Sequence, residues 1–246
     1  MVQRIENRKN RYAEICKSNY KEGEQLENYT KYKLKSTDEL ASLLADKDNL
    51  FVIACNKCFK EFATVDEPDC DEFIKFAEEQ GKHITGSAKV DFLCNKTHTE
   101  KDLPDMIPEG AENIVVISCG LGIQTVAGIT GKSVIAASNS LNYRGHHGMA
   151  LTKKSCDACA QCYLNITGGV CPIVDCSKSL VNGQCGGAKN GKCEVDPNKD
   201  CAWEKIYQRL EKQGRLEEFL QQPVQLRDYS KVNFKFVNDY VKSIRE

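Results

Sequence analysis

Eight cysteines between residues 156 and 201 constrain this chain more than any other feature of its sequence. The same stretch contains many glycines and few large apolar residues, so it cannot fold by burying hydrophobic surface alone. Bound metal or disulfide bonds are the usual substitutes for a core in such a segment. The chemistry of these thiols therefore decides how this part of the chain becomes ordered.

The charge balance excludes some classes of partner, and the N-terminal sequence favours metal binding over disulfide bonds. The formal net charge is −1, with 34 basic and 35 acidic residues, so neither nucleic acid nor an anionic membrane is expected as a partner. No apolar run approaches the roughly 18 residues of a membrane span, and the N-terminus lacks the apolar core of a secretory signal. We therefore expect a cytoplasmic protein whose thiols stay reduced and serve mainly as metal ligands.

The rest of the sequence predicts an α/β fold, with a small parallel-sheet Rossmann-like domain followed by a cysteine-rich, metal-ordered domain. Residues 1–35 predict an N-terminal helical arm, and Ser36 with Glu39 forms a capping box for a helix that follows. Residues 36–148 alternate strand-like and helical patterns, which is typical of a mainly parallel sheet. The predicted strands cover residues 50–55, 89–94, 112–120 and 132–139. The predicted helices cover residues 70–82, 123–131 and 201–220.

Residues 149–210 are predicted to form the cysteine-rich domain, and residues 211–246 a C-terminal tail that binds a partner. The first three cysteines of the cysteine-rich domain have the spacing C-x2-C-x2-C, which brings three thiols to one side of a turn. The pair Cys171-Pro172 follows them. Bacterial ferredoxins have such a triplet, with three residues before the Cys-Pro where this chain has eight. Because zinc sites more usually pair two C-x2-C units, the triplet favours an iron–sulfur cluster. The eight thiols suffice for two four-thiolate sites, and their spacing leaves open which four share a site. They are Cys156, Cys159, Cys162, Cys171, Cys176, Cys185, Cys193 and Cys201.

A further metal site is predicted at the edge of the sheet. Cys55, Cys94 and Cys119 each end a predicted strand, and Cys58 follows Cys55 by one turn. The carboxyl ends of parallel strands meet at one edge, so these thiols are expected to converge. We predict a [4Fe–4S] cluster there, with zinc as the alternative. The two remaining cysteines, Cys16 and Cys70, are predicted to be ordinary thiols.

The stretch CGLGIQTVAG lacks the glycine pattern of a dinucleotide-binding turn. Thr125 stands at the position of the third glycine, and no acidic residue follows at the required distance. Gly120 and Gly122 are instead predicted to let the turn pass close to whatever Cys119 binds.

The cysteine-rich sequence CDACAQCYLNITGGVCPIVDCSKSLVNGQCGG, continued by GKCEVDPNKDCAW, resembles the methylenetetrahydrofolate reductase C-terminal domain. That domain is found in the MetV-type small subunit of two-subunit reductases. The segments VIACNKC and VVISCGLGIQTVAG are also similar to that subunit, so the resemblance covers roughly residues 36–210. Gln184 departs from the family, which has proline at this position.

The resemblance implies two or three [4Fe–4S] clusters, with zinc possible in one site. It implies the same ligands, namely Cys55, Cys58, Cys94 and Cys119, and the eight cysteines from Cys156 to Cys201. It also implies a MetF-type partner, a TIM barrel that binds flavin (FMN) and the folate. Such a barrel needs about 250 residues, for which this chain has no room beside its own domains.

We therefore expect an accessory iron–sulfur subunit of a flavin-dependent methylenetetrahydrofolate reductase that is not catalytic alone. Its clusters would pass single electrons to or from the partner's flavin, which would deliver a hydride equivalent to the methylene group. Two alternatives stay open. One is a metal-folded docking subunit without a redox role, and the other is an electron-transfer module of another flavoenzyme. Further electron-transfer subunits would be additional partners.

Overall fold

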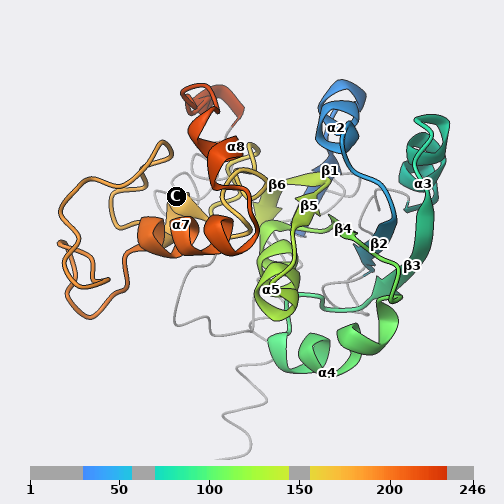
Figure 1. Cartoon of the computed structure of the whole chain (residues 1–246), viewed down its shortest axis with the longest axis horizontal. Coiled ribbons are helices and arrows are strands. Elements are labelled where there is room, and N and C mark those ends of the chain that lie inside the picture. Colours follow the sequence, from blue (N-terminus) through green and yellow to red (C-terminus); the bar gives the residue numbers. More distant parts are fainter. Residues whose placement is uncertain (1–29, 57–69, 144–155, 232–246) are drawn as a thin grey trace, which may run out of the picture.

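A four-stranded parallel sheet forms the centre of the molecule (Figure 1). The structure is a computed structural model that describes residues 30–56, 70–143 and 156–231. The strand order is β3-β2-β4-β5, with β2 at Leu50–Cys55, β3 at Ile84–Val90, β4 at Asn113–Ile117 and β5 at Val134–Ala136. The predicted α/β fold with a parallel sheet is confirmed.

Helices cover both faces of this sheet (Figure 1). On one face, α2 (Thr37–Leu44) and α3 (Cys70–Glu79) bury Leu40 and Phe73 against β2 and β4. On the other face, α4 (Lys96–Met106) and α5 (Gly120–Thr130) bury Leu103 and Ile123. Strand β2 is buried along its whole length, because its apolar run faces a helical layer on each side.

The start of α2 and the end of α3 agree with the sequence. The hydroxyl of Ser36 accepts a hydrogen bond from the backbone N–H of Glu39 (3.3 Å), which confirms the predicted helix start. Helix α3 ends before Gly81, whose φ of +74° is a left-handed conformation that glycine adopts readily.

The prediction of a helical arm is wrong for residues 30–34. These residues form β1 (Thr30–Leu34), which pairs antiparallel with β6 (Ser138–Tyr143) in a separate two-stranded sheet. The rest of the predicted arm, residues 1–29, lies outside the described residues. The predicted strand 132–139 is split, because only Val134–Ala136 joins the parallel sheet and the chain then turns into β6.

Two other predicted elements have different boundaries in the structure. Strand β3 ends at Val90 and not at Cys94, because residues 91–94 form a turn in which Phe92 has a φ of +54°. The single helix predicted over 201–220 is divided into α7 (Ala202–Lys212) and α8 (Leu216–Leu220). Gly214 between them has a φ of +65°, so the backbone leaves the helical conformation there.

The cysteine-rich segment packs against the sheet and shares its core, so a separate second domain is not confirmed. Leu164 and Ile173 belong to the same hydrophobic cluster as Phe51 and Ile123. The side-chain amide of Asn165 accepts from the backbone N–H of Ala136 (2.7 Å) and donates to its carbonyl (3.1 Å). Asn165 therefore takes the place of a neighbouring strand at the edge of β5.

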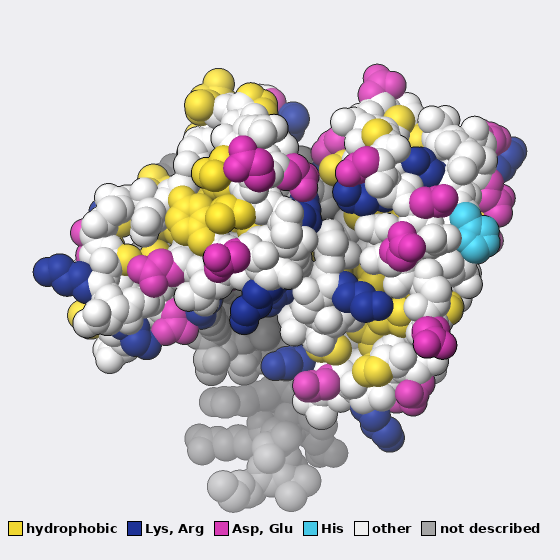
Figure 2. Space-filling view, in the orientation of Figure 1, with side chains coloured by type: hydrophobic (Ala, Val, Ile, Leu, Met, Phe, Trp, Pro, Cys, Tyr) yellow, Lys and Arg dark blue, Asp and Glu magenta, His cyan; other side chains and the backbone are white. Residues whose placement is uncertain are grey.

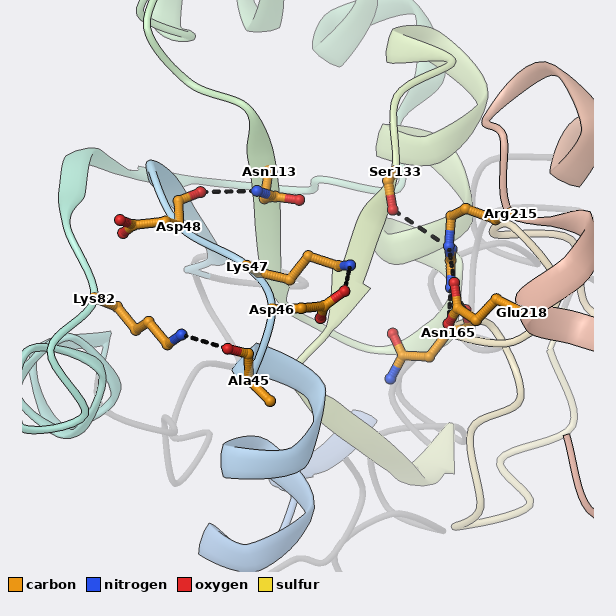
Figure 3. A network of polar contacts seen from close by, with 10 residues as sticks. All are labelled: Ala45, Asp46, Lys47, Asp48, Lys82, Asn113, Ser133, Asn165, Arg215 and Glu218. Carbon is orange, nitrogen blue, oxygen red and sulfur yellow. Dashed lines mark hydrogen bonds and ion pairs between the residues drawn. The ribbon is translucent and has the colours of Figure 1, made fainter. Parts of the chain in front are cut away.

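Two arginines fix α7 and α8 to the sheet domain. Arg209 donates to the carbonyl of Ala127 at the end of α5 (2.8 Å). Arg215 donates to the carbonyl of Asn165 (2.9 Å) and forms an ion pair with Glu218 (2.9 Å), as Figure 3 shows. In the part of the chain that the structure describes, no helix is long and apolar enough to cross a membrane.

Candidate metal centres

Four cysteines line one cavity beside the first turn of α5. Cys156, Cys159, Cys162 and Cys171 all line this pocket, which we call the first cavity. These are the C-x2-C-x2-C triplet and the cysteine of the Cys-Pro pair. The structure therefore brings together four thiols that the spacing alone could not assign to one site.

The loop of the first cavity has an unusual backbone at two alanines. Ala158 and Ala160, the small residues between the cysteines, have φ angles of +47° and +53°. A residue with a side chain rarely adopts this conformation, and such strain is concentrated at functional sites. Alternation of this kind turns successive backbone N–H groups toward a common concave side, an arrangement that binds anions in many iron–sulfur sites.

Two contacts from β6 hold the loop in place. The backbone N–H of Ala160 donates to the carbonyl of Ser140 (3.0 Å), and that of Cys162 donates to the side-chain oxygen of Asn139 (3.0 Å). The antiparallel sheet that the sequence did not predict therefore positions the cysteine triplet.

Gly120 is required by the closeness of Cys156. A Cβ atom at Gly120 would lie 2.7 Å from the sulfur of Cys156, and its N–H donates to the hydroxyl of Ser140 (2.7 Å). The prediction that both glycines let the turn pass close to whatever Cys119 binds stays a prediction. Gly120 makes room for Cys156, and Gly122 makes room for the side chain of Ser118.

Burial favours the protonated form of three thiols of the first cavity when no metal is bound. It raises the pKa of Cys162 to about 12 and also raises the pKa values of Cys159 and Cys171. Backbone hydrogen bonds lower these pKa values in part by stabilising the thiolates. Leu164 provides one to Cys162, and Val174 provides one to Cys171. A metal centre would displace these protons, so its binding here would release them to solvent.

A second group of four cysteines lines another cavity, next to α7. Cys176, Cys185, Cys193 and Cys201 all line this pocket, which we call the second cavity. Trp203, in the first turn of α7, closes one side and is only 1% exposed. Its indole N–H donates to the carbonyl of Leu180 (3.0 Å), which fixes the ring within the loop that carries the cysteines.

The cysteines of the second cavity are more exposed than those of the first. Cys185 is exposed, whereas Cys171 is buried. The thiol of Cys185 donates to the carboxylate of Glu194 (3.4 Å), which also forms an ion pair with Lys178. A metal-bound thiolate has no proton to donate, so metal binding would leave Lys178 as the partner of Glu194.

The predicted site at the edge of the sheet is placed only in part. Cys55 ends β2 and Cys119 precedes α5, and both are buried. They flank the point between β2 and β4 where the direction of strand addition reverses, the usual binding position in such sheets. Their side chains join hydrophobic clusters on opposite faces of the sheet. Cys94 lies in the turn after β3, and Cys58 lies outside the described residues, so this site stays a prediction.

The described residues contain no three cysteine, histidine or acidic side chains close enough to hold a single metal ion. In each cavity, the four thiols instead line one pocket. A zinc ion requires sulfurs about 2.3 Å from one centre, whereas a cluster of four iron atoms occupies a larger volume. Four thiols that line one cavity match the number of ligands of a four-iron cluster.

The sequence did not indicate the segment that spans both cavities. Gln161, in the first cavity, donates to the carbonyl of Leu226 (3.1 Å) and accepts from the N–H of Asp228 (3.0 Å). Asn182, in the loop of the second cavity, forms the same pair of bonds with Gln225 (2.9 and 2.6 Å). We call residues 222–228 the strap. The roles of Gln161 and Asn182 are visible only in the folded structure, because a single amide residue gives no signal in the sequence.

The strap belongs to the tail that was predicted to bind a partner, and its described part lies against this chain. It and its flanks nevertheless present exposed apolar side chains, namely Leu220, Val224, Leu226 and Tyr229. Figure 2 shows hydrophobic side chains over α7 and at the end of the segment that follows α8. Residues 232–246 of the tail lie outside the described residues.

Comparison with known proteins bears on the half of the chain that contains both cavities. Residues 135–230 match the protein family described as methylene-tetrahydrofolate reductase C terminal. No curated protein and no solved structure matches the chain. The matched segment contains all eight cysteines of the two cavities, and the description of the family associates that segment with a reductase.

Proposed function

We propose that this protein is the iron–sulfur electron-transfer subunit of a flavin-dependent methylenetetrahydrofolate reductase. The observation that carries the proposal is the division of eight cysteines into two cavities with four thiols each. Four thiolates are the ligand set of a [4Fe–4S] cluster. The match of residues 135–230 to that reductase family supports the same conclusion.

The first cavity has the features that such a cluster needs from a protein. Cys156, Cys159, Cys162 and Cys171 would hold it, and backbone N–H groups at Leu164 and Val174 would donate to its sulfurs. Hydrogen bonds of this kind help to set the reduction potential. When bound, a cluster of this type supplies transfer of one electron at a time. The packing of Leu164 and Ile173 into the core excludes water from one side of the site.

The flavin and the folate are assigned to a partner subunit. The described sheet has four parallel strands and thus does not form an eight-stranded barrel. Reduction of the methylene group to methyl requires two electrons and two protons. Two one-electron centres beside a flavin match that requirement, because a flavin accepts electrons singly and donates them as a hydride.

Metal and sulfide analysis of anaerobically purified full-length protein tests this proposal. We expect about eight iron atoms with matching acid-labile sulfide from the two cavities, and about four more if the sheet-edge site is also filled. Cys159→Ala and Cys185→Ala should each lose about four iron atoms, since each removes a ligand from a different cavity. Cys70→Ala is the matched control, because this buried cysteine of α3 lines neither cavity.

A second measurement tests the redox role. Protein reduced with dithionite and freed of excess reductant should reduce the flavin of its barrel partner in the complex. Zinc with little sulfide, or clusters that do not reduce the flavin, would contradict the proposal. Either result would support a metal-folded docking subunit, because zinc has no redox chemistry.

A further inference from the structure

Lys35 is a buried cation close to the first cavity. It lies between β1 and the N-cap of α2, and only 2% of its side chain is exposed. Its ammonium group donates to Glu39 (2.5 Å) and to the side-chain oxygen of Asn139 (3.0 Å). Burial of a charge is costly unless it is paired and hydrogen-bonded, so these two partners explain why the charge is tolerated.

Asn139 connects this charge to a ligand of the first cavity. The same side-chain oxygen accepts both from Lys35 and from the backbone N–H of Cys162 (3.0 Å). The ammonium group therefore lies within two hydrogen-bond lengths of the Cys162 backbone.

The ion pair of Lys35 and Glu39 is asymmetric. The Glu39 side chain is 46% exposed, so water screens its negative charge, whereas the ammonium group is enclosed. The interior side of the pair thus faces the cavity with a net positive field. A fixed positive charge stabilises the centre that has gained an electron, because four thiolates already make the site strongly negative.

We propose that the ammonium group of Lys35 raises the reduction potential of the cluster held in the first cavity. This inference rests on the proposed function. Reduction adds one electron to the cluster, and no bond to Lys35 forms or breaks. In the complex, the electron comes from a further electron-transfer subunit and passes on to the partner's flavin, and in a titration it comes from the chemical reductant.

The test is a potentiometric titration of full-length, iron-loaded protein followed by electron paramagnetic resonance. Lys35→Met should lower the midpoint potential of one cluster signal, because the positive charge is lost. Glu39→Gln should raise the midpoint potential of the same signal, because the opposing negative charge is lost. The signal of the second cavity should stay unchanged in both variants and serves as the internal control.

Opposite shifts separate a charge effect from a structural one. Both variants break the same ion pair, so a purely structural role would move the potential in the same direction or not at all, and that result would overturn the inference. Lys35→Arg keeps the charge and should remain close to wild type. If Lys35→Met fails to fold, Glu39→Gln still decides the question, because Glu39 is largely exposed. Wild-type protein without any cluster would overturn the proposed function itself, a separate outcome.

Discussion

The two cavities have the same number of cysteines but very different support from the rest of the chain. The first is enclosed by α5, β6 and the core of the sheet, and its loop is hydrogen-bonded to Ser140 and Asn139. The second is built from the loops of residues 176–201, which extend away from the sheet past α7 (Figure 1). Within these loops the regular pairing consists of isolated bridges of Lys192 with Lys189 and Asp200.

This difference shows that one ligand set can have two physical roles. The first cavity is shaped by protein packing, so its metal would meet a site that already exists. The second cavity borrows apolar support mainly from Trp203, Ile206 and Leu210. Its loops bury too little surface to order themselves, so metal binding there would be coupled to folding.

The largest expected effect is that of metal removal. Chelation should raise hydrogen exchange in residues 177–200 by more than about 100-fold, because a structural metal can contribute on the order of 10 kcal/mol to order. The strands of the sheet should change little. Mass spectrometry of exchange before and after chelation measures both regions in one sample. Equal loss of protection in the loops and in β4 would show that the two regions are not independent.

Truncation of Trp203 should act mainly on the second cavity. Trp203→Ala should cost about 3–5 kcal/mol, because it empties the centre of the small core that supports the loops. Denaturant unfolding measures the loss, and iron analysis should show that only the second cavity is affected. Tyr207→Phe is the control, since it preserves the ring that packs against Trp203. Loss of iron from both cavities would argue against their separation.

A methyl group at Gly120 should disturb only the first cavity. Gly120→Ala places a carbon too close to the sulfur of Cys156, so we expect a cost of about 1–3 kcal/mol and loss of the first cluster. Gly128→Ala in the same helix has open space around the added carbon and should be stabilising by about 1 kcal/mol. Thermal unfolding and iron content distinguish the two variants. Equal stability and equal iron content would contradict the close approach of Gly120 to the sulfur of Cys156.

The smallest expected effect concerns the attachment of α8. The guanidinium of Arg215 lowers the pKa of Glu218 from its ordinary value of 4.5, so the ionised carboxylate stabilises the fold above that pH. Glu218→Gln should cost at most about 1 kcal/mol at pH 7, after allowance for solvent screening. The difference from wild type should disappear as the pH falls through the lowered pKa. Glu217→Gln is the control, because Glu217 bonds to Gln221 instead (3.0 Å), and denaturation across pH measures both.

The parts of the molecule that sequence predicts well are those set by local pattern. The apolar run of β2 and the amphipathic α3 follow from side-chain periodicity, and the parallel sheet follows from their alternation. The pairing of β1 with β6 joins residues about a hundred positions apart in the sequence, so no local pattern contains it. The end of β3 was missed because Val90 and Leu93 are both buried, and an apolar turn resembles a strand in sequence.

The ligand types of the candidate sites could be predicted, whereas their grouping could not. Cysteine spacing indicates metal chemistry, but it contains no record of how the loops fold back. Cys171 and Cys176 are only five residues apart and line different cavities. Lys35 gave no signal either, since its role depends on Asn139 from the distant strand β6.

The side chain of Asn165 has a consequence for the behaviour of the chain in a crowded cell. Strand β5 lies at an edge of the sheet, and an open edge can pair with strands of other molecules. Asn165 occupies both backbone groups of Ala136 at this edge. Displacement of residues 163–167 would expose that edge as a template for aggregation. The segment between Cys162 and Cys171 therefore also protects the chain against self-association.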